Sequence, residues 1–303
     1  MISLLNVSIN KKSYFSLLGA ALLAATEVSG APIQERRIER VRWLMGTACM
    51  IQAEGTDSGA AATAAFEEIE RWDLVLSLYK EASELNALNR SAGTGPFRVS
   101  PELYAAVETA LRLAHETAGA FDPTILPVLR RGPEALGLVG WSKVRLDPSA
   151  RTIELPTRGM GLDFGGIGKG WALDRAADVL RRRGVTRAFI NFGGQILALG
   201  APRGLDAWSV RLPGVKEPIM VRDASVSTSG DSQRPGHISS PFDGGPLRRK
   251  FSATAVLASA AEADAWSTAL YVLGMNPPSF RGRSLFVPAS AKKVAAVHKG
   301  GRS

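Results

Sequence analysis

The feature that most constrains the fold is a glycine-dense turn, LDFGGIGKG at residues 162–170, that runs into an amphipathic helix ended by Gly184. Backbone N–H groups at such a helix start can bind phosphate oxygens, and Lys169 adds positive charge. The turn matches neither common nucleotide fingerprint. Gly170 stands where a P-loop has Ser or Thr, and Trp171 stands where the dinucleotide motif needs a glycine. Two interpretations of the glycine turn stay open: it binds phosphate in another way, or its glycines allow tight packing between a strand and a helix.

A second polar segment, ADAWST at residues 263–268, places three side-chain oxygens close together on a predicted helix. Asp264 and Thr268 are four residues apart with Ser267 between them, so they project from neighbouring positions of one face. Hard oxygen ligands of this kind suit Mg²⁺. The alternatives are an Asp that favours the helix start and a Thr that bonds back to the preceding turn. A phosphate-binding turn together with a magnesium site indicates chemistry on a nucleotide pyrophosphate.

Composition and charge exclude several classes of protein. The 303 residues, 45% of them hydrophobic, can bury the core of one large domain or of two closely packed lobes. Cys49 has no partner for an intramolecular disulfide, and its apolar surroundings predict a buried side chain. Residues 281–303 carry six of the basic residues and no acid, which predicts a mobile basic tail. The rest of the chain is nearly neutral, so we expect no nucleic-acid partner.

The N-terminus has the pattern of an export signal. Lys11 and Lys12 precede an apolar run at residues 14–25, and small residues suited to cleavage follow at 29–31. We therefore expect residues 1–31 to be a signal peptide, either cleaved or retained as an anchor, and the protein to be periplasmic. The run is short for a membrane span, and no other stretch is long enough, so we expect no transmembrane domain apart from this segment.

Helical and strand patterns mix without regular alternation, which predicts an α+β fold. Residues 83–89 read as a polar, turn-prone segment. The hydrophobic periodicity, with Ser100 and Pro101 as start signals for the second helix, predicts helices over 60–80, 101–118, 170–183 and 263–273. The predicted strands are a hairpin over 144–155 and the segments 187–192, 196–199, 208–212, 225–230 and 252–257.

His237 is one of three histidines and lies in a loop rich in Gly, Pro and Ser. A loop histidine is commonly a plain surface residue. Because imidazole titrates near neutral pH, His237 is also a candidate general base that deprotonates a hydroxyl.

The order of these segments resembles the ApbE-type FAD:protein FMN transferase family. The resemblance covers about residues 43–275, and its eight segments together are specific, although each one alone is modest. The segments are MGT at 45–47, LYK at 78–80, SEL at 83–85 with Asn89, GAFDPT at 119–124, the glycine turn on to Asp174, NFGG at 191–194, TSG at 228–230 with HI at 237–238, and ADAWSTAL at 263–270.

The resemblance implies a single flavin-transferase-type domain, which we place at residues 32–280, and a reaction. FAD is the substrate and Mg²⁺ the metal; FMN passes to a Thr or Ser hydroxyl of an acceptor protein as a phosphoester, and AMP leaves. The expected acceptor is a subunit of a respiratory or redox membrane complex. The implied metal site is a backbone oxygen near Gly166 with Asp264, Ser267 and Thr268, and His237 is the catalytic residue. The implied FAD-binding residues are Met45, Tyr79, Ala120, Phe121, Asp122, Asp163, Lys169, Thr228, Ser229, Gly230 and Ile238.

Two departures from the family pattern lie beside His237. Ser240 precedes Pro241 where the family commonly has Asp, and Ser232 follows Asp231 where the family often has an aromatic residue. Two alternatives to the transferase stay open, and the departures bear on the second of them. One is a pyrophosphatase that hydrolyses FAD to FMN and AMP, and the other is a non-catalytic FAD carrier or assembly factor for a periplasmic respiratory complex.

Overall fold

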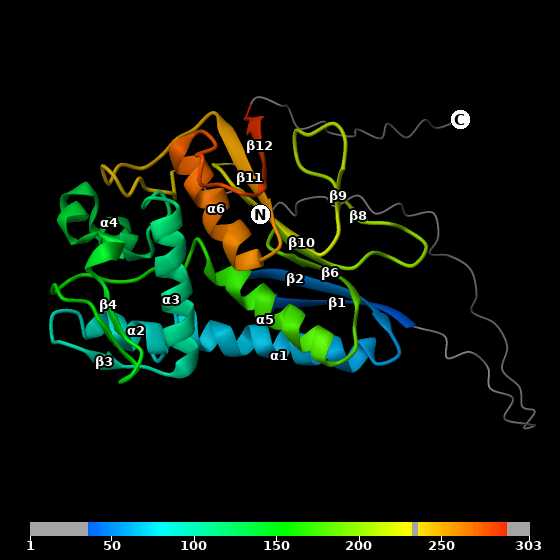
Figure 1. The fold of residues 1–303 in the computed structure, drawn as a ribbon, viewed down its shortest axis with the longest axis horizontal. Coiled ribbons are helices and arrows are strands. Elements are labelled where there is room, and N and C mark those ends of the chain that lie inside the picture. The colour runs from blue at the N-terminus through cyan, green and yellow to red at the C-terminus, as the bar shows by residue number, and fades with distance from the viewer. Residues whose placement is uncertain (1–35, 232–235, 290–303) are drawn as a thin grey trace, which may run out of the picture.

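A seven-stranded antiparallel sheet organises the chain, in the order β1-β2-β6-β7-β10-β11-β12 (Figure 1). The computed structural model describes residues 36–231 and 236–289. The predicted signal segment and Ser232 therefore lie outside the described residues. The strands of this sheet are Arg36–Leu44 (β1), Thr47–Gly55 (β2), Arg187–Phe192 (β6), Gln195–Leu199 (β7), Ala224–Ser229 (β10), Phe251–Leu257 (β11) and Arg283–Pro288 (β12).

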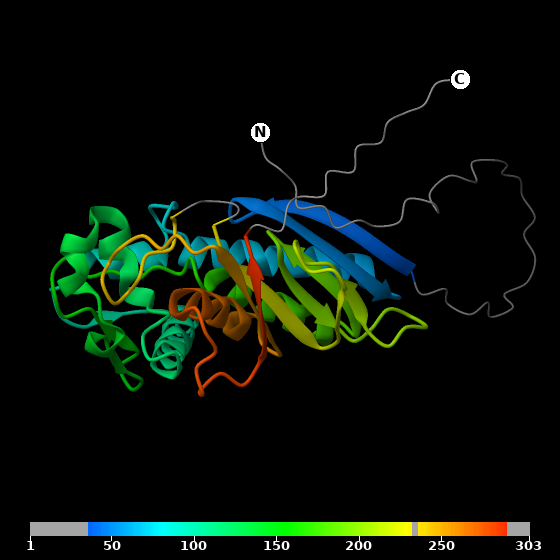
Figure 2. The same ribbon diagram turned by 90° about the horizontal axis from the view of Figure 1, so that it is seen from above.

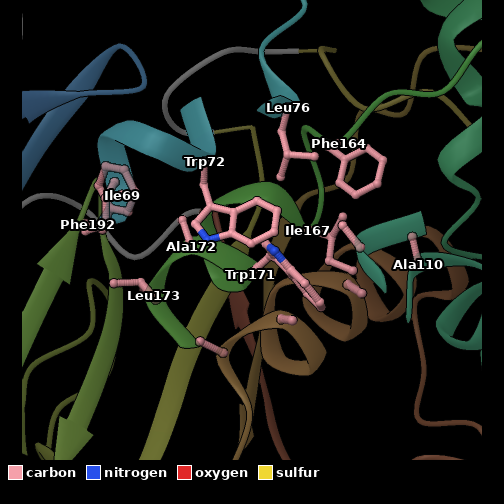
Figure 3. Close-up of a cluster of buried hydrophobic side chains, with 14 of the residues drawn as sticks. Ile69, Trp72, Leu76, Ala110, Phe164, Ile167, Trp171, Ala172, Leu173 and Phe192 are labelled. Atoms are coloured by element: carbon pink, nitrogen blue, oxygen red, sulfur yellow. The ribbon is translucent and has the colours of Figure 1, made fainter. Parts of the chain in front are cut away.

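Three helices pack against one face of this sheet (Figures 1 and 2). They are α1 (Ser58–Leu76), which contacts β1 and β2, α6 (Ala260–Leu273), which contacts β10 and β11, and α5 (Gly168–Arg182), which lies between them. The core fills the space between the helices and the sheet, and Figure 3 shows its centre. There the rings of Trp72 and Trp171 meet edge to face with centroids 5.4 Å apart.

The opposite face of the sheet is covered by a small hairpin of β8 (Trp208–Val210) and β9 (Ile219–Val221). Its side chains pack with Phe189, Ile196 and Val226 in a second, smaller core. The sheet therefore has apolar side chains on both faces, which accounts for the fully buried pattern of β7.

A second layer of elements lies beside the main sheet, at the left of Figure 1. It joins the rest of the molecule through contacts of α2 with α1 and of its longest helix, α3, with α6. Its members are α2 (Glu84–Arg90), α3 (Pro101–Glu116), α4 (Leu126–Arg131), the short strands β3 (Phe97–Arg98), β4 (Arg145–Asp147) and β5 (Thr152–Glu154), and 3₁₀ helices at Pro123–Ile125, Pro133–Leu138 and Trp141–Lys143.

The α+β fold is confirmed, and so are most of the predicted elements. Strand β6 has the predicted bounds. Ser100 caps α3 as expected, because its side chain accepts a hydrogen bond from the N–H of Leu103. Cys49 is fully buried on β2. None of the helices in the described part of the chain combines the length and apolar character needed to cross a membrane.

Two expectations are wrong. Residues 84–90 form a helix rather than a turn, because Ser83 supplies an N-cap by accepting from the N–H of Asn86. The tail expected from residue 281 contains β12, which pairs with β11 and extends the sheet. Val287 is buried and Phe286 packs on Phe251, so apolar contacts outweigh the flanking basic charge. The basic residues from 290 onward lie outside the described residues.

Candidate active site

Several of the motifs singled out in the sequence meet at one end of the main sheet. The antiparallel register pairs Cys49 with Phe192 and Val226 with Ile196. As a result, three segments lie at the same end of the sheet: the β1–β2 turn at 45–46, the β6–β7 turn at 193–194 and the end of β10. Met45 occupies its turn with a positive φ of 45°, and its side chain reaches the start of α5 at Gly168.

Helices α5 and α6 cross in backbone contact at this end. A Cβ atom on Gly170 would lie 2.1 Å from the carbonyl oxygen of Ala260, so the crossing tolerates only glycine. The close approach brings the N–H of Gly170 to Oδ2 of Asp264 at 3.1 Å. The tight-packing alternative is therefore correct for Gly170, although the partner is a helix rather than a strand.

The predicted metal residues come together where α6 faces β10. The Oγ of Ser267 lies 2.9 Å from the Oγ of Ser229, which lies 3.3 Å from Oγ1 of Thr268. Oδ1 of Asp264 accepts a hydrogen bond of 3.1 Å from Ser227. Gly166 adjoins the same cluster, since a Cβ built on it would lie 3.2 Å from Oγ1 of Thr268.

Ser227 belongs to this oxygen cluster and was missed in the sequence. The side chains of residues 227 and 229 point to the same face of β10 because alternate residues of a strand share a face. The alternating serines of SVSTS at 225–229 indicate a row of hydroxyls on one face of a predicted strand, but not that this face meets the helix of Asp264.

The start of α5 gives the cluster positive character. Nζ of Lys169 lies 3.7 Å from Oδ2 of Asp264. The N-cap residue of α5, Ile167, makes no side-chain capping bond, and the positive end of the helix dipole faces the Asp264 carboxylate. A carboxylate, several hydroxyls, an ammonium group and a helix N-terminus together are suited to a metal ion and a phosphate group.

Asp163 lies at the entrance to the glycine turn. Its Oδ1 accepts from the N–H of Gly165, and its own N–H donates to the carbonyl of Pro123 at 2.7 Å. Burial raises the pKa of the Asp163 carboxyl above its usual value. Asn89 fixes Leu162, the residue before Asp163, through two hydrogen bonds with its backbone that are 2.7 and 2.9 Å long. The predicted nucleotide turn is thus held from two sides.

The segment 120–124 forms a wall of the site. Ala120 and Phe121 are buried, and the Phe121 ring lies against Gly166, 3.3 Å from where a Cβ would be. The carboxylate of Asp122 accepts from the N–H and hydroxyl of Thr124 and from the N–H of Trp141. Burial raises the pKa of Asp122, against the opposing effect of these bonds. The Asp122 side chain therefore shapes the loop from within.

Comparisons with known proteins identify the family of this chain. Residues 45–279 match the model of the ApbE family. The chain belongs to the ApbE family. It is similar to a FAD:protein FMN transferase of Treponema pallidum, with 30% identity over 301 residues, 84% of this chain and 83% of that protein. A protein of the same name from Klebsiella pneumoniae is 29% identical over 77% of this chain and 81% of its own.

Solved ApbE structures share the fold. The flavin transferase ApbE from Vibrio cholerae superposes with a TM-score of 0.72 at 25% identity, covering 79% of this chain and 87% of that chain. An ApbE protein from Thermotoga maritima superposes with a TM-score of 0.73 at 28% identity and with the same coverage of both chains.

The loop after β10 carries His237, the predicted catalytic residue. His237 is exposed and precedes a hairpin in which Leu247 donates to the carbonyl of Ile238. Ser240, where the ApbE family commonly has Asp, accepts from the N–H groups of Phe242 and Asp243 at 3.2 and 3.4 Å. An Asp side chain makes bonds of this type in turns. Ser240 therefore preserves the shape of the hairpin without the negative charge.

Of the remaining predicted FAD residues, Ser229 alone bonds directly to the oxygen cluster within the described part of the chain. Thr228 is exposed and pairs with Thr254, while Gly230 packs against Ser252. Ile238 is half-buried on the main core. The ring of Tyr79 is 94% exposed, and its segment is held by Asn86, whose amide donates to three carbonyls of residues 77–80. The roles of these residues toward FAD stay predictions.

Proposed function

We propose that this chain transfers FMN from FAD to a hydroxyl group of an acceptor protein and releases AMP. The observation that carries the proposal is the meeting of the α5 N-terminus and Lys169 with the oxygens of Asp264, Ser267 and Thr268. These groups are complementary to a metal-bound pyrophosphate, the part of FAD that the reaction cleaves. The names of the curated ApbE relatives support the same activity.

The donor set fits Mg²⁺ held jointly with a substrate. Within residues 36–231 and 236–289 no group of three or more His, Cys, Asp or Glu side chains could hold a metal alone. The cluster offers one carboxylate, hydroxyl oxygens and the backbone near Gly166, and Mg²⁺ commonly completes such a set with substrate phosphates and water. When bound, the metal would neutralise charge that develops on the pyrophosphate.

The chain's own residues would then divide the remaining work. Lys169 and the N-terminus of α5 bind phosphate oxygens, while Asp163 and the wall at Phe121 orient the nucleotide and the flavin. His237 accepts the proton of the acceptor Thr or Ser. The freed oxygen attacks the phosphorus of the FMN moiety, and the bond from that phosphorus to the bridging oxygen breaks. AMP leaves with the bridging oxygen, and the acceptor keeps FMN as a phosphoester.

We further propose that the reaction takes place in the periplasm. The support is the signal pattern in residues 1–31. The proposed acceptor is a subunit of a respiratory or redox membrane complex that presents its Thr or Ser outside the cytoplasm.

The test is incubation with FAD and Mg²⁺, with and without an acceptor domain, followed by in-gel flavin fluorescence and AMP release. Labelling of the acceptor that EDTA or Asp264→Ala abolishes is the expected result. The matched control is Asp178→Asn, a surface change on α5 that leaves labelling unchanged. AMP release without an acceptor would favour hydrolysis by water, which the exposure of His237 permits. Bound FAD with neither product, across several acceptors, would favour a carrier and refute the transferase.

A further inference from the structure

Asp174 is a carboxylate on α5 that the proposed reaction does not use. It follows Gly170 by one helical turn and faces the start of α6. Its Oδ1 accepts from the N–H of Ala260 at 2.7 Å, and its Oδ2 accepts from the hydroxyl of Ser259 at 2.7 Å and from the N–H of Ala261 at 3.0 Å. Three donors on one element therefore converge on a single side chain of another.

These donors form the first turn of α6. Ser259 is the N-cap, and its Oγ, which donates to Asp174, also accepts from the N–H of Glu262 at 3.2 Å. The first N–H groups of a helix have no acceptor within the helix, and a negative charge is favourable at this end. Asp174 supplies both the acceptor and the charge from the neighbouring helix.

A residue of β7 holds the same turn from the sheet. Nε2 of the buried Gln195 donates to the carbonyl oxygen of Ala260 at 2.8 Å. The close crossing at Gly170 allows no space between the two helices here. The first turn of α6 is thus fixed by α5 and β7 together.

The metal-binding oxygens follow on the same rigid element. Asp264 lies one turn after Ala260, and Ser267 lies about one turn further along the helix. Any shift or rotation at the first turn is passed on to these side chains, because an α-helix moves largely as a unit over two turns.

We propose that Asp174 is a positioning residue for the reaction: by binding the start of α6, it sets where the oxygens of α6 face the N-terminus of α5. The inference rests on the proposed function, because it takes these oxygens as metal ligands. It gives the last residue of the nucleotide motif a role at the helix that carries the metal, rather than at the nucleotide itself.

The test compares Asp174→Asn with Asp178→Asn. Asp178 lies one turn later on α5 and forms surface ion pairs with Arg175 and Arg181, so the control removes the same charge from the same helix. Binding of Mn²⁺, as a spectroscopic substitute for Mg²⁺, is followed by EPR in the presence of ADP as the diphosphate probe. Loss of a partner that orients metal ligands commonly weakens metal binding 10–100-fold. We expect a half-saturating Mn²⁺ concentration about tenfold higher for Asp174→Asn, and unchanged for Asp178→Asn.

The outcomes separate the inference from the proposed function. If the unaltered protein binds no Mn²⁺ with ADP, the metal-dependent function fails and the inference fails with it. If it does bind, and folded Asp174→Asn has the same midpoint but lower thermal stability, Asp174 only stabilises α6 and the inference is refuted. If Asp174→Asn does not fold, Ser259→Ala decides. That variant removes one donor and keeps the carboxylate, so an unchanged Mn²⁺ midpoint for it would also refute the inference.

Discussion

The crossing of α5 and α6 at Gly170 allows a sharp test of how the site is assembled. In Gly170→Ala the new Cβ would lie 2.1 Å from the carbonyl oxygen and 2.5 Å from the carbonyl carbon of Ala260. Ordinary contacts of a Cβ begin at 3.4 Å. Both obstacles are backbone atoms, which no side-chain rotation can move aside, so the helices must separate by roughly 1 Å.

The cost can be estimated from the contacts that change. Overpacking of a tight contact costs about 3 kcal/mol. Weakening of the hydrogen bond from Gly170 to the Asp264 carboxylate adds about 1.5 kcal/mol. Alanine is a better helix former than glycine by about 1 kcal/mol, which offsets part of the loss. We expect the free energy of unfolding to fall by about 3.5 kcal/mol, which corresponds to a drop in Tm of roughly 10 °C for a domain of this size.

The assay is urea unfolding followed by tryptophan fluorescence, with Gly137→Ala as the control. A Cβ at Gly137 would have no described heavy atom within 4 Å, so this variant should stay within about 0.5 kcal/mol of the unaltered protein. Equal unfolding midpoints for the two variants would show that the crossing is not the close contact described here.

Two further predictions concern buried ionisable groups. Burial raises the pKa of Asp122 above 3.8, so the folded state keeps this proton to higher pH than the unfolded chain does. Ionisation of Asp122 therefore lowers the free energy of unfolding as the pH rises from about 3.8 through the raised pKa. In Asp122→Asn this contribution is absent, so the free energy of unfolding should fall less steeply over the same pH range. Urea unfolding at several pH values measures this, and an equal pH dependence for the variant and the unaltered protein would contradict the assignment. Burial also raises the pKa of the Cys49 thiol from 9.0 to about 12, so the folded protein should not react with a disulfide reagent at pH 8, whereas the unfolded chain should react with one equivalent. Rapid labelling of the native protein would show that Cys49 is accessible.

Local patterns were enough to predict most of the elements. The largely apolar run at 187–192 placed β6, and the Ser-Pro start of α3 gave both its cap and its first residue. The prediction failed at residues 84–90, where a helix only two turns long has too few residues to show a period. It also failed at β12, because the basic residues around 281–299 masked a short apolar run that finds its place only beside β11.

The site divides in the same way. Asp264, Ser267 and Thr268 share one helix, so their spacing alone predicted that their oxygens lie together, and the structure confirms it. Ser227 reaches them from a strand about 40 residues away, and its seryl neighbours on β10 gave no sign of which face would meet α6. A side chain that completes a site across such a distance in sequence is visible only once the sheet register is known.

The sequence by itself determined most of the elements, the family and the residues with suitable chemistry, because capping, periodicity and motif spacing act over a few residues. The tertiary structure decided what those residues touch. Asp122 accepts hydrogen bonds within its own loop, and Asp174 accepts them from the first turn of α6. The physical reason is that a carboxylate takes whichever donors the packing of distant elements brings within about 3 Å, and spacing along the chain does not encode that packing.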